Sequence, residues 1–316
     1  GKSGDTYQHV VYRNYLQSMR PAMPVQNPAT DKIAVIIAKG TILDGEQPAG
    51  EAGGDTIAKL IRKAKNSQNV KAIVLRVDSP GGSSAASELI RTELVAIQKS
   101  GKPVVASMGG YAASGGYWIS STADKIFASE TTITGSIGVF TIFPTFERSL
   151  DYLGVHSDGI GTTSLSGAMN NFDEINPIFK RALQSSVDRT YDKFLALVSE
   201  GRGISIEEAD AVAQGRVWAG SRALEHGLID GIGDVNVAIE SAAALAGLTN
   251  YDVVYMEKEL SSRELILRQV LQSSISLLPS LQTSLFPAIP AELKTLSLMT
   301  RSPSIYLQCT NCKITF

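Results

Sequence analysis

The residues best suited to chemistry lie in two glycine-rich loops, each of which follows an apolar run. The first loop reads Asp-Ser-Pro-Gly-Gly over residues 78–82, and the second places Ser114 between two alanines and a pair of glycines. A serine on a sharp strand-to-helix turn exposes its hydroxyl, and the N–H of the next residue, Gly115, can face an oxyanion. The sequence therefore predicts Ser114 as a nucleophile for acyl transfer.

Each loop also has a plain structural interpretation. Pro-Gly-Gly can be only a tight turn, because glycine adopts positive φ at little cost. Ser114, among small residues, can be a packing or capping residue. The two loops support the catalytic interpretation together, since adjacent parallel strands bring their carboxyl ends to one edge of a sheet. Backbone N–H groups in the first loop would then stabilise developing negative charge.

A nucleophilic serine needs a group that takes its proton, and the sequence offers no obvious one. The chain has three histidines: His9, His156 and His226. Only His156, followed by Asp158, lies near an expected strand edge, which leaves a Ser-His-Asp triad open. A desolvated lysine could also serve, but no lysine lies between Lys125 and Lys180.

The composition is typical of a globular protein. Of the 316 residues, 43% are hydrophobic and 19% are charged, which excludes disordered, collagen-like and coiled-coil classes. The 29 basic and 31 acidic residues give a net charge of −2, so we expect no nucleic-acid partner. Cys309 and Cys312 form a lone C-x-x-C, too few ligands for a zinc site. We expect no metal and no cofactor.

No segment of the sequence predicts a membrane span. The uncharged windows 103–123 and 269–291 are long enough, but glycine and serine interrupt the first, and glutamine, serine and proline interrupt the second. The chain begins at Gly1 without a methionine or a signal peptide. We therefore expect it to be part of a longer polypeptide.

Strands and helices are expected to alternate along the chain. The expected strands are 31–39, 72–77, 104–108, 125–128, 137–142 and 252–256. The expected helices begin at Asp55, at Ser83 or Ser84 and after the Ser114 loop, and continue with 176–199, 205–214, 220–225 and 235–246. This alternation of strands and helices predicts an α/β protein with a largely parallel sheet and a helical C-terminal part. The predicted layout is an entry segment 1–30, a domain 31–250 and an extension 251–316.

Four motifs together resemble one known family. They cover residues 78–82, 112–117, 134–138, and 215–218 with 227–230. They occur in the order found in the signal peptide peptidase A, or protease IV, family of the Clp/crotonase fold, and the resemblance spans about residues 31 to 246. It implies a ββα superhelix with a mostly parallel sheet. It also implies a serine protease with a Ser-Lys dyad that degrades cleaved signal peptides at the periplasmic side of the bacterial inner membrane.

The resemblance assigns roles to four residues of this chain. Ser114 matches the nucleophile, the Gly82 and Gly115 amides match the oxyanion hole, and Ser136 matches a serine that orients the lysine. Short members carry that lysine in a segment that here, at 161–166, contains none. In long members an N-terminal half supplies the lysine and a C-terminal half supplies the serine, and this chain resembles the latter.

The resemblance also implies the partners of the chain. They are signal peptides and other hydrophobic peptides, the N-terminal half of the same protein, and further copies in a homotetramer. The inner membrane would be reached through an anchor outside this chain.

Two other functional classes stay open. A crotonase-type acyl-CoA enzyme shares the fold and the two-amide oxyanion hole but uses a carboxylate as acid or base. A non-catalytic half would bind extended peptide at a sheet edge. A fluorophosphonate label on Ser114 is expected only for the peptidase. Peptide binding that survives Ser114→Ala, without hydrolysis by the full-length protein, would favour the binding half.

Overall fold

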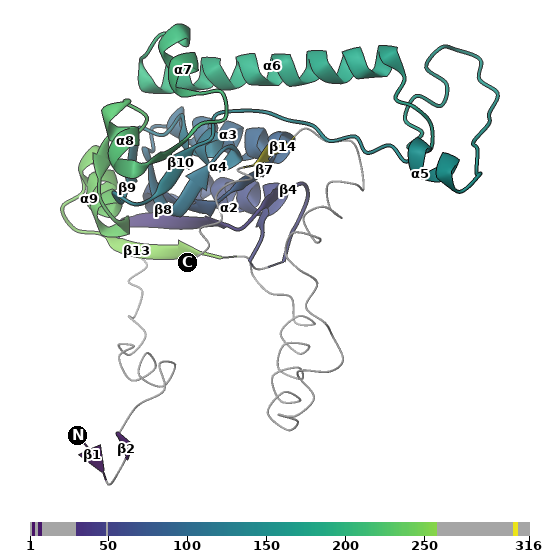
Figure 1. Cartoon of the computed structure of the whole chain (residues 1–316). Coiled ribbons are helices and arrows are strands. Elements are labelled where there is room, and N and C mark those ends of the chain that lie inside the picture. The colour runs from purple at the N-terminus through teal and green to yellow at the C-terminus, as the bar shows by residue number, and fades with distance from the viewer. Residues whose placement is uncertain (1, 4–5, 8–29, 49, 258–305, 309–316) are drawn as a thin grey trace.

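The computed structural model describes residues 2–3, 6–7, 30–48, 50–257 and 306–308 (Figure 1). The strands are β1 Lys2–Ser3, β2 Thr6–Tyr7, β3 Lys32–Lys39, β4 Ile42–Leu43, β5 Ala52–Gly53, β6 Val70–Ser79, β7 Gly81–Ser83, β8 Val104–Ala113, β9 Lys125–Ala128, β10 Ile133–Gly135, β11 Val217–Ala219, β12 Gly231–Ile232, β13 Asp252–Met256 and β14 Tyr306–Gln308. The helices are α2 Gly54–Asn66, α3 Ser84–Gln98, α4 Gly115–Ser120, α5 Glu147–Tyr152, α6 Pro177–Arg202, α7 Ile206–Val212, α8 Gly220–Glu225 and α9 Val235–Leu245.

The main sheet has the strand order β11-β10-β8-β6-β3-β13, and β9 pairs with both β8 and β12. Every pair in it is parallel except β10 with β11. A second, smaller sheet has the order β14-β7-β4-β5. The predicted α/β class with a mostly parallel sheet is confirmed.

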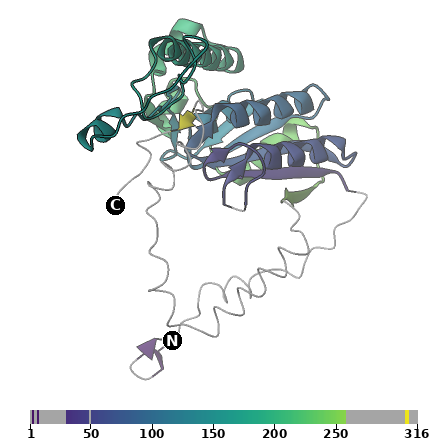
Figure 2. The same ribbon diagram turned by 90° about the vertical axis from the view of Figure 1, so that its right-hand side faces the viewer.

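Helices cover both faces of the main sheet (Figures 1 and 2), as strand β3 illustrates. Ile33 and Val35 are buried in a cluster with α9, whereas Ala34 and Ile36 are buried in a cluster with α2 and α3. A strand buried on both faces reads as a continuous apolar run rather than an alternating one. This burial explains why the sequence predicted the strand over 31–39.

Strand β8 carries a bulge near its end. Val77 of β6 pairs with Met108, but Ser79 pairs with Ala112, so extra β8 residues lie opposite Asp78. A bulge bends a strand and changes the direction of the residues after it. Before the bulge β8 pairs with β9, and after it β8 pairs with β10.

Asp78 stabilises this bulge. Its Oδ1 accepts the N–H of Gly110 at 3.1 Å and that of Tyr111 at 3.4 Å. Gly109 leaves room for this contact, because a Cβ there would lie 2.8 Å from Asp78 Oδ1. The first chemical motif of the sequence thus fixes the strand that leads to the second.

Residues 142–190, which we call the arm, extend away from the sheet (Figures 1 and 2). Helix α5 lies at the far end of the arm, and most of α6 leads back to the body. Near its C-terminus, α6 buries Phe194 and Val198 in the core. Several large apolar side chains of the arm are exposed: Tyr152, Leu153, Val155, Ile160 and Phe172. Among the described helices, none is both long and apolar enough to cross a membrane.

The expectation of a strand over 137–142 is wrong. The strand in this region is β10, and it ends at Gly135. Gly135 has φ +75° and Ser136 has φ +50°, conformations that stop an extended strand. Ile137 is fully buried, but it packs in the core without belonging to a strand. The predicted domain boundaries stay predictions.

Candidate active site

Ser114 lies where β8 ends and α4 begins, on the strand-to-helix turn that the sequence predicted. Its backbone has φ +55° and ψ −114°, a conformation that costs a non-glycine residue about 1–3 kcal/mol. Two backbone hydrogen bonds hold it, from Ser114 N–H to the Gly135 carbonyl at 2.8 Å and from Trp118 N–H to the Ser114 carbonyl at 2.8 Å. Ser114 is only 1% exposed in the single chain, which contradicts the expectation that this turn exposes its hydroxyl.

Strand β7 brings Gly82 to the same end of the sheet. Helix α4 packs against both β6 and β7, and a Cβ on Gly116 would lie 2.7 Å from the Ser79 carbonyl oxygen. Gly82 has φ +151°, and a Cβ there would lie 2.0 Å from the Ile42 carbonyl oxygen. This approach of β7 to β4 requires glycine. The first helical residue, Gly115, leaves its N–H without an intrahelical acceptor.

Three strained residues lie close together around Ser114. Ser114, Ser136 and Gln214 are the non-glycine residues with positive φ in the described part of the chain. Ser114 N–H bonds to the residue that precedes Ser136, and Ser136 N–H bonds to the Arg216 carbonyl at 2.7 Å. Strained residues gather at functional sites, where the surroundings hold them in place. Sequence reasoning identified Ser114 and Ser136 but missed Gln214.

The turn at Gln214 is fixed by helix α6. The Tyr191 hydroxyl donates to the Asp210 carboxylate and accepts the Gln214 N–H at 3.2 Å. Burial, and next the hydrogen bond to Asp210, raises the pKa of Tyr191 to about 12. The Gln214 side-chain amide also donates to Asp210, at 3.1 Å. Helix α6 therefore supports the loop that bonds to Ser136.

The motif at 227–230 contacts α4 through a backbone carbonyl. The buried Tyr117 hydroxyl of α4 donates to the Leu228 carbonyl at 2.8 Å, and burial raises the pKa of Tyr117. Asp230 pairs with Arg202 at 3.0 Å and with Lys125 at 3.2 Å. Lys125 is therefore engaged in an ion pair rather than directed at Ser114.

No lysine or histidine among the described residues hydrogen bonds to Ser114. His156 is 73% exposed, and its partner is Asp151 of α5 at 3.8 Å. Because α5 lies at the far end of the arm (Figure 1), His156 is remote from α4, and the expectation that it lies at a strand edge is wrong. Residues 161–166, which by resemblance correspond to the lysine-bearing segment of short members, form an exposed part of the arm.

Strand β14 lies along β7. It pairs antiparallel with it, and Leu307 is the partner of Gly82. An extended backbone therefore occupies the edge of the strand that carries Gly82. Cys309 and Cys312 follow β14 and lie outside the described residues.

The sheet and the turn at Ser114 together indicate an enzyme class. The molecule is an α/β protein with a mostly parallel sheet. At one edge of the sheet it holds a buried serine on a strained strand-to-helix turn, beside a strand of glycines. Serine hydrolases place their nucleophile on such a turn.

Comparison with known proteins identifies the family. Residues 96–249 match the family model "Peptidase family S49", a range that includes Ser114, Gly115 and Ser136 but not Gly82. Protease 4 of Haemophilus influenzae is 49% identical over 249 residues, which are 78% of this chain and 40% of that protein. A candidate protease of Synechocystis sp. is 35% identical over 225 residues, which are 71% of this chain and 78% of that protein. The chain belongs to peptidase family S49.

The chain spans less than half of the Haemophilus protein, 40% of its length. Among solved structures, a mutant of the 1510-N membrane-bound stomatin-specific protease is similar over 73% of this chain and 100% of that one, with 18% identity and a TM-score of 0.46.

Proposed function

We propose that this chain carries the nucleophile of a serine endopeptidase. The observation that carries the proposal is the Ser114 turn, a buried serine held in a strained conformation between β8 and α4. Strain of this kind persists only where the surroundings enforce it, and the Gly135 and Trp118 hydrogen bonds do so here. Membership of peptidase family S49 supports the same conclusion.

In the proposed reaction the Ser114 hydroxyl attacks the carbonyl carbon of a peptide bond while a base takes its proton. The N–H groups of Gly82 and Gly115 stabilise the resulting oxyanion. The intermediate then collapses, the C–N bond breaks, and the leaving amine takes the proton back. Water hydrolyses the acyl-enzyme by the same steps.

The base in this proposal is a lysine from an N-terminal half of the same polypeptide, and Ser136 orients it. Two observations support this division. Ser114 has no lysine or histidine partner in the described part of the chain. The chain also covers only 40% of the Haemophilus relative, which leaves length for another half.

The proposed substrates are cleaved signal peptides and other hydrophobic peptides, bound as extended strands. The pairing of β14 with β7 supports this mode, because an extended backbone already lies along the edge beside Gly82. Backbone pairing of this kind gives affinity without demanding one sequence.

The proposed assembly is a homotetramer at the periplasmic side of the inner membrane, held by an anchor outside this chain. The exposed apolar side chains of the arm support self-association, since Tyr152 is 91% and Leu153 is 70% exposed in the single chain. Large exposed apolar patches mark interaction surfaces. Light scattering should give four copies, and a stable, fully active monomer would contradict the assembly.

The nucleophile is tested by Ser114→Ala in the full-length polypeptide. Peptide hydrolysis should be abolished with the fold intact, because alanine fits a turn of small residues. Ser120→Ala is the matched control, since it removes a buried hydroxyl from α4 that donates to the Gly116 carbonyl at 2.9 Å. Hydrolysis by Ser114→Ala above a tenth of wild type contradicts the proposal. Retained peptide binding, with a wild type that does not hydrolyse, favours a non-catalytic binding half.

The origin of the base has its own test. Purified residues 1–316 should not hydrolyse a signal-peptide-like substrate, because an unassisted serine hydroxyl is a weak nucleophile at neutral pH. Addition of the N-terminal half should restore hydrolysis. Robust activity of residues 1–316 alone would place the base inside this chain.

A further inference from the structure

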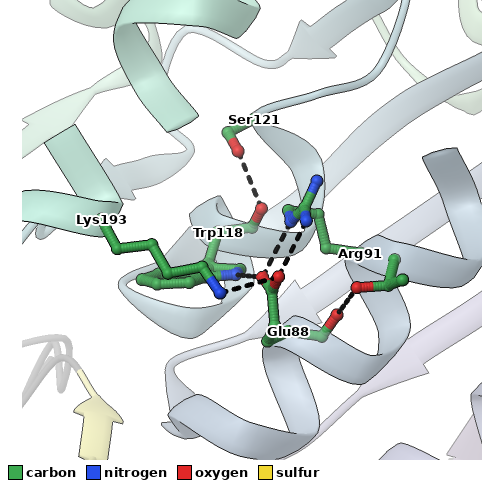
Figure 3. Close-up of polar contacts among 6 residues, drawn as sticks. Glu88, Arg91, Trp118, Ser121 and Lys193 are labelled. Carbon is green, nitrogen blue, oxygen red and sulfur yellow. Dashed lines mark hydrogen bonds and ion pairs between the residues drawn. The ribbon is translucent and has the colours of Figure 1, made fainter. Parts of the chain in front are cut away.

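The carboxylate of Glu88 is the centre of a polar cluster between three helices (Figure 3). Its Oε2 accepts hydrogen bonds from Arg91 Nε at 2.8 Å and from Trp118 Nε1 at 2.9 Å. Its Oε1 accepts one from Arg91 Nη2 at 2.8 Å and pairs with Lys193 Nζ at 2.9 Å. Glu88 and Arg91 belong to α3, Trp118 to α4 and Lys193 to α6. One carboxylate therefore joins these three helices.

Two of the three helices begin at, or shortly after, a glycine of the candidate oxyanion hole. Helix α3 begins at Ser84, directly after the strand that contains Gly82. Helix α4 begins at Gly115, directly after Ser114. Neither glycine has a side chain that could fix its own position. The distance between the two amides therefore depends on how α3 and α4 are held together.

Trp118 connects the carboxylate to the nucleophile by a short path. Its indole N–H donates to Glu88, and its backbone N–H donates to the Ser114 carbonyl at 2.8 Å. The side chain is 1% exposed and packs against Phe194 of α6, with ring centroids 4.8 Å apart. A shift of the indole would therefore move the first turn of α4 and the backbone of Ser114.

Glu88 is ionised at neutral pH. Burial by itself would raise its pKa, but the hydrogen bonds from Arg91, Lys193 and Trp118 outweigh burial and lower the pKa to about 2. The ionised carboxylate therefore keeps its contacts with Arg91, Trp118 and Lys193 at neutral pH. A buried ionic group of this kind can fix one arrangement of the elements that it joins.

We propose that Glu88 is a positioning residue. Through Trp118, it fixes the positions of the Ser114 hydroxyl and of the Gly82 and Gly115 amides relative to one another. The proposal rests on the proposed function of Ser114. Lys193 extends the same connection to α6, and the N-terminal part of that helix belongs to the arm. Glu88 acts on the geometry of the site and does not contact the substrate.

The test compares Glu88→Gln and Trp118→Phe in the full-length protein. The first keeps the shape of the side chain but removes its charge, and the second keeps an aromatic ring but removes the indole N–H. Each should lower kcat and the rate of fluorophosphonate labelling of Ser114 by about tenfold or more, with KM unchanged, because small misplacements of reacting groups cost that much. The double variant should be no worse than the more impaired single variant, since both changes break one connection.

Glu93→Gln is the matched control. Glu93 lies on α3 like Glu88, but it pairs with Arg62 of α2 at 2.8 Å. This variant should keep the wild-type labelling rate. Wild-type labelling in Glu88→Gln, or additive losses in the double variant, would overturn the positioning role. If Glu88→Gln does not fold, Trp118→Phe alone decides, and wild-type kcat in that variant refutes the proposal. A wild type that never labels at Ser114 would refute the proposed function instead.

Discussion

Replacing Gly82 with alanine perturbs the candidate oxyanion hole at a position where the structure gives the displacement. A Cβ at Gly82 would lie 2.0 Å from the Ile42 carbonyl oxygen. Carbon and carbonyl oxygen tolerate about 3.3 Å, so β7 must move by about 1.3 Å. Both atoms belong to paired strands and not to a flexible side chain, so the strand carries the shift.

Such a shift is large enough to break a hydrogen bond of ordinary length. Loss of one oxyanion donor lowers kcat by about 10²–10³-fold. The alanine also has to adopt φ +151° in a crowded position, so we expect the free energy of unfolding to fall by about 1–3 kcal/mol.

The assay measures kcat for peptide hydrolysis and the free energy of unfolding on the same preparation. Gly101→Ala is the control, because Gly101 has φ +85° but a Cβ added there would meet no atom within 4 Å. It should lose about 1 kcal/mol of stability from backbone strain and keep the wild-type kcat. A Gly82→Ala protein with wild-type kcat would refute the role of this amide.

The same geometry supports three further predictions. Ser114→Gly should abolish hydrolysis yet raise the free energy of unfolding by about 1 kcal/mol, because glycine relieves the strain at φ +55°. A lower free energy of unfolding in this variant would contradict the interpretation that Ser114 is strained. Because the pKa of Glu88 is lowered to about 2 from 4.5, its stabilising contribution is complete above about pH 5 and is lost as the pH falls towards 2. The difference in Tm between wild type and Glu88→Gln should therefore narrow as the pH falls from about 5 towards 2. A difference in Tm that stays constant over this pH range would contradict the prediction. His156→Ala should leave hydrolysis unchanged, since His156 lies on the exposed arm, and a large loss would identify it as the base.

Much of the fold could be predicted because its signals are local. The expected strands at 31–39, 72–77 and 104–108 correspond to β3, β6 and β8, whose continuous apolar runs reflect burial on two faces. The helix starts could be predicted in part. Ser83, one of the two residues at which a helix was expected to begin, caps α3 by accepting the Ala86 N–H, whereas the helix expected to begin at Asp55 begins at Gly54 without a side-chain cap.

The remaining features depend on contacts between distant residues. The end of β10 at Gly135 is set by backbone bonds to a loop about 80 residues later, which no local pattern reports. The strained Gln214 is marked in the sequence only by the glycine after it, a weak turn signal. In the sequence, nothing distinguishes Glu88 from an ordinary helical residue. Its partners on α4 and α6 lie far from it in the sequence, and only the fold brings them together.

The position of Ser114 could be predicted from the sequence, but the lack of a lysine or histidine partner among the described residues could be predicted only in part. The sequence showed that no lysine lies between Lys125 and Lys180. It did not show that Lys125 pairs with Asp230, or that His156 lies far out on the arm. Those two findings remove the nearest alternatives and favour a base from another segment.

Site mapping of a covalent inhibitor tests whether Ser114 is a nucleophile, as we propose. The full-length protein is treated with a fluorophosphonate, digested, and analysed by mass spectrometry for the modified residue. We predict a single adduct on Ser114 that is absent from Ser114→Ala and present at the wild-type level in Ser120→Ala. An adduct on another residue, or a hydrolytically active protein that carries none, would contradict the claim.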